Sequence, residues 1–484
     1  MKKKLFVFLT VFSILLFAAV AQTEETGSQP DSIPSTTQLL LSYMENDPDL
    51  KNLLISAKKA ALSYDSTKID NGFDITLSSG TVTLLLGDDG TSVSAKPSAK
   101  AKLPAFSNLS ASVQTNVSYT SNEANVSDTA LSLGIDLISD SNIKTKVTLL
   151  KAERSVTEAE RKLGKSALAT EKEFYTELKS LLSSISSIMN LENDYYTDRI
   201  DFEAKKIQGY SKTSSTYRKA ELKVISDQHE IESSLHSFIH DCVVFYKKCG
   251  YDIQIDENTD LMTLVPSDIE LSEPLNILDF SKEDYAAIES ANWTYKINSL
   301  ERSGQKSYSL SASAGYTLGN STTNSDTVDA GLSGTVGGVS VGAGLSMPVG
   351  TDSFTPAVTL SVSLSPNTFK KNSITKQQNA LTEEQELLAI QTAEAEYETT
   401  VVEMQQKLDS LLWDKNSIEQ NLSMYEELEK DMASMYKQGF TSESEYLSAK
   451  TDLNTYILKK VINQIELLTY NDDVIMNFVP TQEK

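Results

Sequence analysis

The sequence repeats one plan twice, and this duplication constrains the fold more than any other feature. A turn with the sequence Gln-Gly-Tyr-Ser at 208–211 returns as Gln-Gly-Phe-Thr at 438–441, and the two glycines lie 230 residues apart in a chain of 484 residues. Around each turn the same order recurs: a modest helix, a stretch rich in strands, a very long helix, the turn and a return helix. Such self-similarity predicts two copies of one structural unit, in an α+β fold.

The repeat also predicts the boundaries of the elements. Residues 22–260 are expected to form copy one, and residues 261–484 copy two. Copy one is expected to contain a first helix over 36–65, strands within 72–139, a long helix over 142–208 and a return helix over 212–249. Copy two is expected to contain a first helix over 281–303, strands within 307–365, a long helix over 372–438 and a return helix over 442–470.

Both long helices carry apolar side chains at heptad spacing. The first has them at Phe174, Leu178, Leu181, Ile185, Ile188 and Tyr195, and the second at Met404, Leu411, Ile418, Tyr425 and Met432. In the second helix, Lys415 and Glu429 interrupt a further apolar stripe. Sustained heptads predict coiled-coil packing. A helix of about 67 residues spans about 100 Å, three times the thickness of a bilayer, so these polar helices are expected to stand in water.

The strand-rich stretches alternate between apolar and small polar residues. Between 109 and 119, the polar set is Ser110, Ser112, Gln114 and Asn116, and the apolar set includes Val113 and Val117. This alternation predicts strands with one apolar and one polar face. A soluble sandwich core gives the same pattern. An uncharged polar side on strands of about ten residues favours a barrel whose apolar side faces lipid and whose polar side faces a wet lumen.

Further short segments have the character of strands. They are 73–77, 82–86 and 93–99 in copy one, and 328–332 and 339–347 in copy two. These segments lengthen strands beyond a membrane, form external loops or widen a barrel, and the sequence leaves the three alternatives open.

The first 21 residues have the organisation of a signal peptide. Three lysines precede an apolar run from 5 to 17, and small residues lead to a cleavage site after Ala21. The mature chain is therefore expected outside the cytoplasm, beginning at Gln22. Its 40 basic and 67 acidic residues give a net charge of −27, which argues against nucleic acid and anionic lipid surfaces as partners. No apolar run of about 18 residues follows Ala21, so a barrel is the expected way to meet a membrane.

Taken together, these features resemble the TolC-like family of outer membrane efflux proteins. The resemblance is carried by the two repeats, by the signal peptide and by the stretch from Tyr436 to Lys450, which looks like the family's recurring G-x-x-S-x-x-D/E-x-L-x-A element. It implies a homotrimer in the outer membrane, with a β-barrel that continues into a long α-helical coiled-coil barrel in the periplasm. It further implies a passive channel of an efflux or type I secretion system, which works with a periplasmic adaptor protein and an inner membrane transporter.

The resemblance also implies roles for the two turns. In the family these turns are the tips that meet the adaptor, and they correspond here to Gly209, Tyr210 and Ser211 and to Gly439, Phe440 and Thr441. The glycines are expected to end one helix in the left-handed conformation, and Ser211 and Thr441 to cap the next. An aromatic residue replaces the usual aliphatic one, which leaves the identity of the adaptor open. Glu445, six residues after the second glycine, is the candidate for a periplasmic gate, although the next expected acid is Ser448.

Other candidate sites have ordinary explanations. Cys242 and Cys249 are seven residues apart on a predicted helix, too far apart for an intrahelical disulfide, and are expected to be small buried residues. His229, His236 and His240 share a helical stripe but lack the further ligands of a metal site. No enzyme, cofactor or metal is therefore expected. A passive porin or a surface adhesin on a coiled-coil scaffold is the alternative function.

Overall fold

The computed structural model describes residues 34–87, 90–104, 107–120, 123–255, 259–269, 273–305, 308–319, 325–350 and 355–479. The expected signal peptide over 1–21 lies outside these residues. The described chain forms two compact units. Unit 1 is drawn from Met1–Asn46, Phe174–Leu271 and Ser417–Ile465, and unit 2 from Asp47–Glu173, Ser272–Asn416 and Glu466–Lys484.

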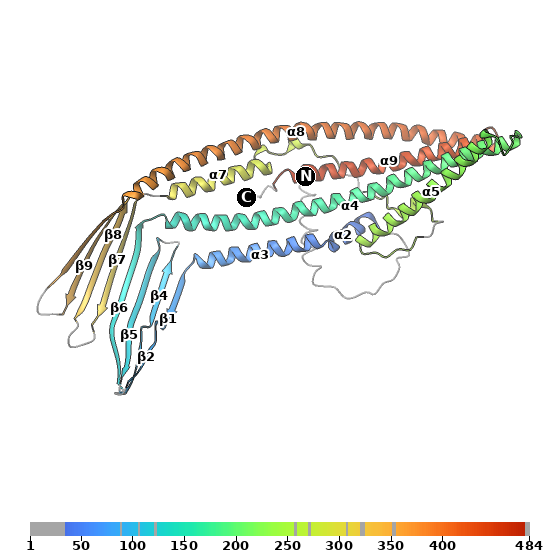
Figure 1. Cartoon of the computed structure of the whole chain (residues 1–484). Helices are drawn as coiled ribbons and strands as arrows, with labels where there is room; N and C mark the ends of the chain where they lie inside the picture. The colour runs from blue at the N-terminus through green and yellow to red at the C-terminus, as the bar shows by residue number, and fades with distance from the viewer. Residues whose placement is uncertain are drawn as a thin grey trace. The chain divides into compact units, whose positions relative to one another are not determined.

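Unit 2 contains one antiparallel sheet (Figure 1). Its strands are β1 (Asp74–Ser78), β2 (Thr83–Gly87), β3 (Gly90–Ala95), β4 (Ser98–Leu103), β5 (Leu109–Thr120), β6 (Glu123–Ile138), β7 (Tyr308–Leu318), β8 (Asp326–Val336), β9 (Val339–Val349) and β10 (Ala357–Leu364). Eight of them follow one path in the order β1-β4-β5-β6-β7-β8-β9-β10, while β2 pairs with β3 and β3 pairs with the far end of β5.

The structure gives the number of strands, which the sequence left open. The described residues form ten strands in one sheet, six before the first long helix and four before the second. The predicted strand over 93–99 is in fact two strands, β3 and β4, which are separated by Lys96 and Pro97. Pro97 has no N–H to give to a ladder, and its carbonyl accepts the N–H of Thr115 at 3.1 Å.

A bulge keeps the faces of β6 consistent. The apolar residues change phase along this strand, from Val126 to Leu131 and Leu133. The register shifts at the same place, because Gln114 pairs with Ala130 while Asn116 pairs with Ser127. Asp128 supplies the extra residue and has a φ of +52°. The bulge therefore places both apolar sets on one face of the sheet.

The helices are α2 (Thr36–Asn46), α3 (Pro48–Asp70), α4 (Ser141–Ile207), α5 (Ser215–Lys248), α6 (Leu261–Leu264), α7 (Ala286–Gly304), α8 (Pro366–Lys437) and α9 (Glu443–Met476), with 3-10 turns η1 (Ile277–Asp279) and η2 (Lys282–Asp284). The long helices α4 and α8 contain 67 and 72 residues. Among the described residues, no helix is both long enough and apolar enough to cross a membrane.

Several predicted helix boundaries need correction. The first helix, expected over 36–65, breaks at Asp47, whose side chain accepts the N–H groups of Asp49 and Leu50 and caps α3. Pro48 then takes the first position of α3, where its missing N–H costs nothing. For the same reason α8 begins at Pro366, six residues before the predicted start.

At the remaining boundaries, the expected helix over 281–303 becomes η2 followed by α7, and the return helix over 212–249 begins at Ser215. The second return helix, α9, continues to Met476, six residues past its predicted end.

Each unit has its own core. In unit 1, the heptad residues Phe174, Leu178 and Ile185 are fully buried, and Phe174 packs against Tyr43 and Phe245 with ring centroids 5.5 and 5.3 Å apart. In unit 2, side chains of η1, α7, α8 and α9 and of residues next to these helices form a cluster. It includes Ile277, Tyr285, Ile288, Met404, Leu411, Tyr470, Val474 and Phe478. The heptad pattern therefore does supply buried positions in both long helices.

The two cysteines are confirmed as buried, free thiols of unit 1. Burial raises the pKa of Cys242 and of Cys249 to about 12. Both thiols are therefore protonated and unreactive at neutral pH.

Candidate functional site

The first turn of unit 1 closes α4 with a Schellman motif. Gly209 has a φ of +79°, its N–H donates to the carbonyl of Lys206 at 3.1 Å, and the N–H of Tyr210 donates to the carbonyl of Lys205 at 3.3 Å. These are the two hydrogen bonds that satisfy the last carbonyls of a helix when a left-handed residue follows it. No heavy atom lies within 4 Å of a Cβ added to Gly209, so the backbone conformation, not space, requires glycine here.

The second turn has the same geometry. Gly439 has a φ of +75° and donates its N–H to the carbonyl of Tyr436 at 3.0 Å, while the N–H of Phe440 donates to the carbonyl of Met435 at 2.9 Å. Both glycines thus adopt the left-handed conformation expected from the sequence.

An exposed aromatic residue follows each glycine. Tyr210 is 45% exposed and Phe440 is 79% exposed. Other aromatic residues near the turns do pack: the rings of Tyr436 and Tyr446 stack at 5.4 Å, and Phe202 contacts Tyr217 at 5.1 Å. An apolar ring in water is unfavourable, and its burial against another surface would lower the free energy. Both side chains are exposed and could be buried in this way.

The caps of the return helices differ from the prediction. Ser211 accepts the N–H of Thr213, and Thr441 donates its hydroxyl to Glu445, so neither residue caps a helix. The caps are Ser214, which accepts the N–H of Tyr217, and Ser442, which accepts the N–H of Glu445. The prediction was wrong because the caps lie five and three residues after their glycines, and the first turn is longer than the second.

Glu445 completes the second cap. Its Oε2 accepts hydrogen bonds from the Thr441 hydroxyl at 2.6 Å, the Ser442 N–H at 2.9 Å and the Ser442 hydroxyl at 2.8 Å. Together with the Ser442 cap, this is a capping box, Ser-x-x-Glu. The hydrogen bond from Thr441, followed by those from Ser442, lowers the pKa of Glu445 to about 2. The carboxylate is therefore ionised at physiological pH.

In unit 2, the polar residues expected to face a lumen lie on one face of β5. Ser110, Ser112, Gln114 and Asn116 alternate with Val113 and Val117 along a strand without an insertion. Ser112 exchanges a hydrogen bond with Ser132 of β6 at 2.7 Å. The opposite face pairs Val113 with Leu131. The strand therefore has the two distinct faces that its alternation predicted.

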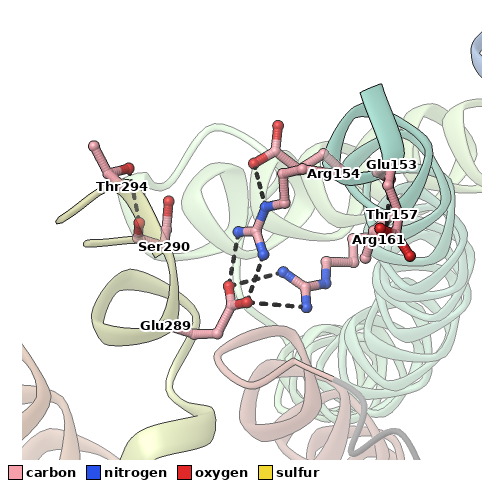
Figure 2. A network of polar contacts seen from close by, with 8 residues as sticks. Glu153, Arg154, Thr157, Arg161, Glu289, Ser290 and Thr294 are labelled. Carbon is pink, nitrogen blue, oxygen red and sulfur yellow. Dashed lines mark hydrogen bonds and ion pairs between the residues drawn. The ribbon is translucent and has the colours of Figure 1, made fainter. Parts of the chain in front are cut away.

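The sequence did not predict the ion pairs that connect helices of unit 2. Glu289 of α7 accepts hydrogen bonds from both Arg154 and Arg161 of α4, with the closest N–O distances at 2.5 and 2.8 Å (Figure 2). The Arg154 guanidinium also lies over the Trp293 ring at 5.1 Å and is only 8% exposed. Burial opposes ionisation of Glu289, but the hydrogen bonds from the two arginines outweigh it and hold its pKa below the usual value.

Three more ion pairs connect helices of unit 2. Asp473 of α9 contacts Lys172 of α4 at 2.5 Å and Lys407 of α8 at 2.8 Å. Glu386 of α8 contacts Arg302 of α7 at 2.8 Å. For the Glu289 contacts, the sequence does contain one indication: Arg154 and Arg161 are seven residues apart, which places both on one face of a helix.

The described residues contain no group of three or more His, Cys, Asp or Glu side chains that could hold a metal ion. His229, His236 and His240 are exposed on α5.

The geometry defines a chain of long α-helical hairpins that also carries an antiparallel sheet with one apolar and one polar face. Residues 39–269 match the TP096X N-terminal domain, and residues 270–481 match the TP096X C-terminal domain. The chain therefore matches both TP096X domains, in order. None of the curated proteins matches the chain by sequence.

Several solved structures are similar to the whole chain. The CmeC outer membrane channel of Campylobacter jejuni is 13% identical, with 96% of this chain and 92% of that chain covered and a TM-score of 0.45. The open state of the MtrE outer membrane channel of Neisseria gonorrhoeae is 12% identical, covering 94% and 96%, with a TM-score of 0.46. The outer membrane protein VceC of Vibrio cholerae is 13% identical, covering 91% and 96%, with a TM-score of 0.44. At such scores the likeness decides nothing about function, which has to come from the geometry of this chain.

Proposed function

We propose that the chain is a subunit of a TolC-like outer membrane channel, through which an efflux or type I secretion system exports its substrates. The channel is a passive duct, and an inner membrane transporter supplies the energy. The sheet lies in the outer membrane and the helical hairpins stand in the periplasm.

The observation that carries this proposal is the exposed apolar face of the sheet. On β10, Val358, Leu360, Val362 and Leu364 are between 65% and 77% exposed. Leu77, Leu131 and Leu133 on other strands are also about half exposed or more. A soluble monomer rarely leaves so large a contiguous apolar surface in water, whereas the outer face of a membrane barrel requires one. The opposite face carries mainly serine, glycine and threonine, with charged residues such as Asp74 and Lys102 near one edge, and these suit a water-filled lumen.

The hairpin tips support a role in docking. Tyr210 and Phe440 are exposed on rigid Schellman turns, where no core of unit 1 receives them. Rigid aromatic side chains commonly anchor protein interfaces. In the proposed assembly, three copies form a homotrimer, and these tips bind a periplasmic adaptor that in turn binds the transporter.

The alternative functions explain fewer features. A passive porin uses the sheet but needs no helices of 67 and 72 residues. A surface adhesin uses long helices but needs no lipid-facing sheet. The channel proposal accounts for both.

Photo-crosslinking in cells tests the proposal. A photoreactive amino acid at Phe440 should capture a periplasmic adaptor protein, which mass spectrometry can identify. The same group at Leu381, an exposed residue of α8 far along the sequence from the tip, is the control. Capture of the same proteins at both positions, or of no adaptor at Phe440, would count against docking through the tip.

A further inference from the structure

We propose, on the basis of the channel function above, that all eight strands of the main sheet path form the wall of the passage. Each subunit then contributes eight strands, and the passage of a trimer is wide enough for folded polypeptides.

The first support is an apolar row that crosses the sheet without a break. Pairing places one apolar residue of each strand side by side, from β1 to β10: Ile75, Ala101, Ala111, Leu133, Ala314, Ala330, Leu345 and Val358. If β1 and β4 were part of an external loop, water would surround them, and nothing would require their apolar residues to align with those of the other strands. The continuous row indicates that all eight strands meet the same lipid phase.

The second support is the neighbouring row on the opposite face. It consists of Asp74, Lys102, Ser110, Gly134, Ser313, Gly331, Gly344 and Thr359. Every member is glycine or carries a charged or hydroxyl side chain. A Cβ added to Gly331 would lie 2.7 Å from the Ser313 hydroxyl, and one added to Gly344 would lie 2.6 Å from the Thr359 hydroxyl. Glycine therefore relieves crowding between neighbouring strands on this face.

The small residues also argue against closure within one chain. A barrel of eight strands has an interior that side chains just fill. Glycine and serine cannot fill it, so a closed single chain would enclose a void. Among the described residues, β1 pairs only with β4, β2 only with β3 and β10 only with β9. The sheet therefore has two free edges, one formed by β1 and β2 and the other by β10. We assign these edges to other copies of this chain, because an unpaired edge in a membrane leaves backbone groups without hydrogen bonds.

The width of the passage follows from the strand count. Strands about 4.8 Å apart and tilted by about 40° each add roughly 6 Å to the circumference. Three copies with eight strands each then give a backbone diameter of about 48 Å, compared with about 24 Å for four strands each. A folded domain of about 100 residues is roughly 34 Å across. The exit in the membrane is therefore compatible with macromolecular cargo.

Disulfide crosslinking of the full chain in outer membranes tests the assignment. Thr76→Cys of β1 is combined in turn with Thr359→Cys, Ser361→Cys and Ser363→Cys of β10, so that different registers are sampled. The competing arrangement, in which β1 and β4 lie outside the wall, is tested by Ser112→Cys of β5 with the same three partners. The natural thiols are buried and protonated, so they do not interfere.

We expect disulfides between copies for a pair that joins β1 to β10, and electron microscopy of the purified particle should show a ring of about 48 Å. The eight-strand wall would be overturned by disulfides between copies from the β5 pairs, or by an oligomer that forms no disulfide with any pair. A β1–β10 disulfide within one chain would show a barrel closed by a single chain and would overturn the wide passage. Absence of any oligomer in native mass spectrometry would instead refute the channel function on which the inference depends.

Discussion

Glu445 stands at the start of α9, where one carboxylate oxygen accepts three hydrogen bonds. These bonds lower its pKa to about 2 from the usual carboxyl value of 4.5. A lowered pKa means that the capping contribution is complete above about pH 4.5 and is lost as the pH falls toward 2.

The sequence had suggested a gate at Glu445, and that role stays a proposal alongside the cap. As a gate, Glu445→Gln should raise single-channel conductance for anions relative to cations in planar bilayers.

Ser442 offers a direct test of the cap. Ser442→Ala should destabilise the first turn of α9 by about 1 kcal/mol, because an unpaired N–H remains at the helix start. Hydrogen exchange of residues 443–446 should then be about fivefold faster. Ser448→Ala, six residues further along the chain, is the control and should leave exchange unchanged. Equal rates in wild type and Ser442→Ala would mean that the capping box contributes nothing.

Glu289 is the residue on which the α4–α7 contact depends most. Glu289→Gln removes the charge that Arg154 and Arg161 share, and it leaves the nearly buried Arg154 guanidinium with Glu158 as its remaining acidic partner. We expect a loss of about 2–3 kcal/mol in the free energy of unfolding, measured by denaturant titration at pH 7. Because the pKa of Glu289 is lowered in the folded chain, this difference should shrink as acid protonates the wild-type carboxyl.

The neighbouring pair Lys151–Glu301 provides the matched control. Its side chains are 47% and 46% exposed, so solvent screens the attraction. Glu301→Gln should cost no more than about 0.5 kcal/mol. Similar losses for both variants would show that Glu289 is only a surface ion pair.

At the scale of elements, the sequence could locate the long helices and their turns because two strong local signals coincide there. Heptad spacing gives buried residues such as Leu178 and Met404, and glycine gives the left-handed ends at Gly209 and Gly439. The strand count was not accessible, because a short apolar run such as 93–99 is equally consistent with a loop, a strand or two strands. The ion pairs of Glu289 were also hidden, since a contact across 128 residues leaves no local pattern.

The two tips are the elements on which docking is expected to depend. Tyr210→Ala combined with Phe440→Ala should reduce adaptor binding more than tenfold, because an aromatic anchor typically contributes about 2 kcal/mol or more. Oligomer formation should be unchanged, since both side chains are exposed. Leu381→Ala serves as the control. Normal adaptor binding and export by the double variant, measured by crosslinking and by secretion assays, would rule out docking through these two residues.

At the scale of the whole molecule, the proposed channel pairs the open edges of the sheet with other copies of the chain. Native mass spectrometry in detergent should give the mass of three copies, because paired edges satisfy the backbone groups of β1 and β10. A spectrum with monomer alone, from protein that is correctly folded by circular dichroism, would contradict the assembly.

The central claim is that the apolar face of the sheet meets lipid and the polar face meets water. Labelling of single cysteines in isolated outer membranes tests it most directly. Ser112→Cys should react with a membrane-impermeant maleimide, whereas Val113→Cys should react only with a lipid-soluble one, because the two side chains point to opposite faces of β5. Equal reaction of both positions with the impermeant reagent would mean that water covers both faces, and the sheet would then not be the wall of a membrane channel.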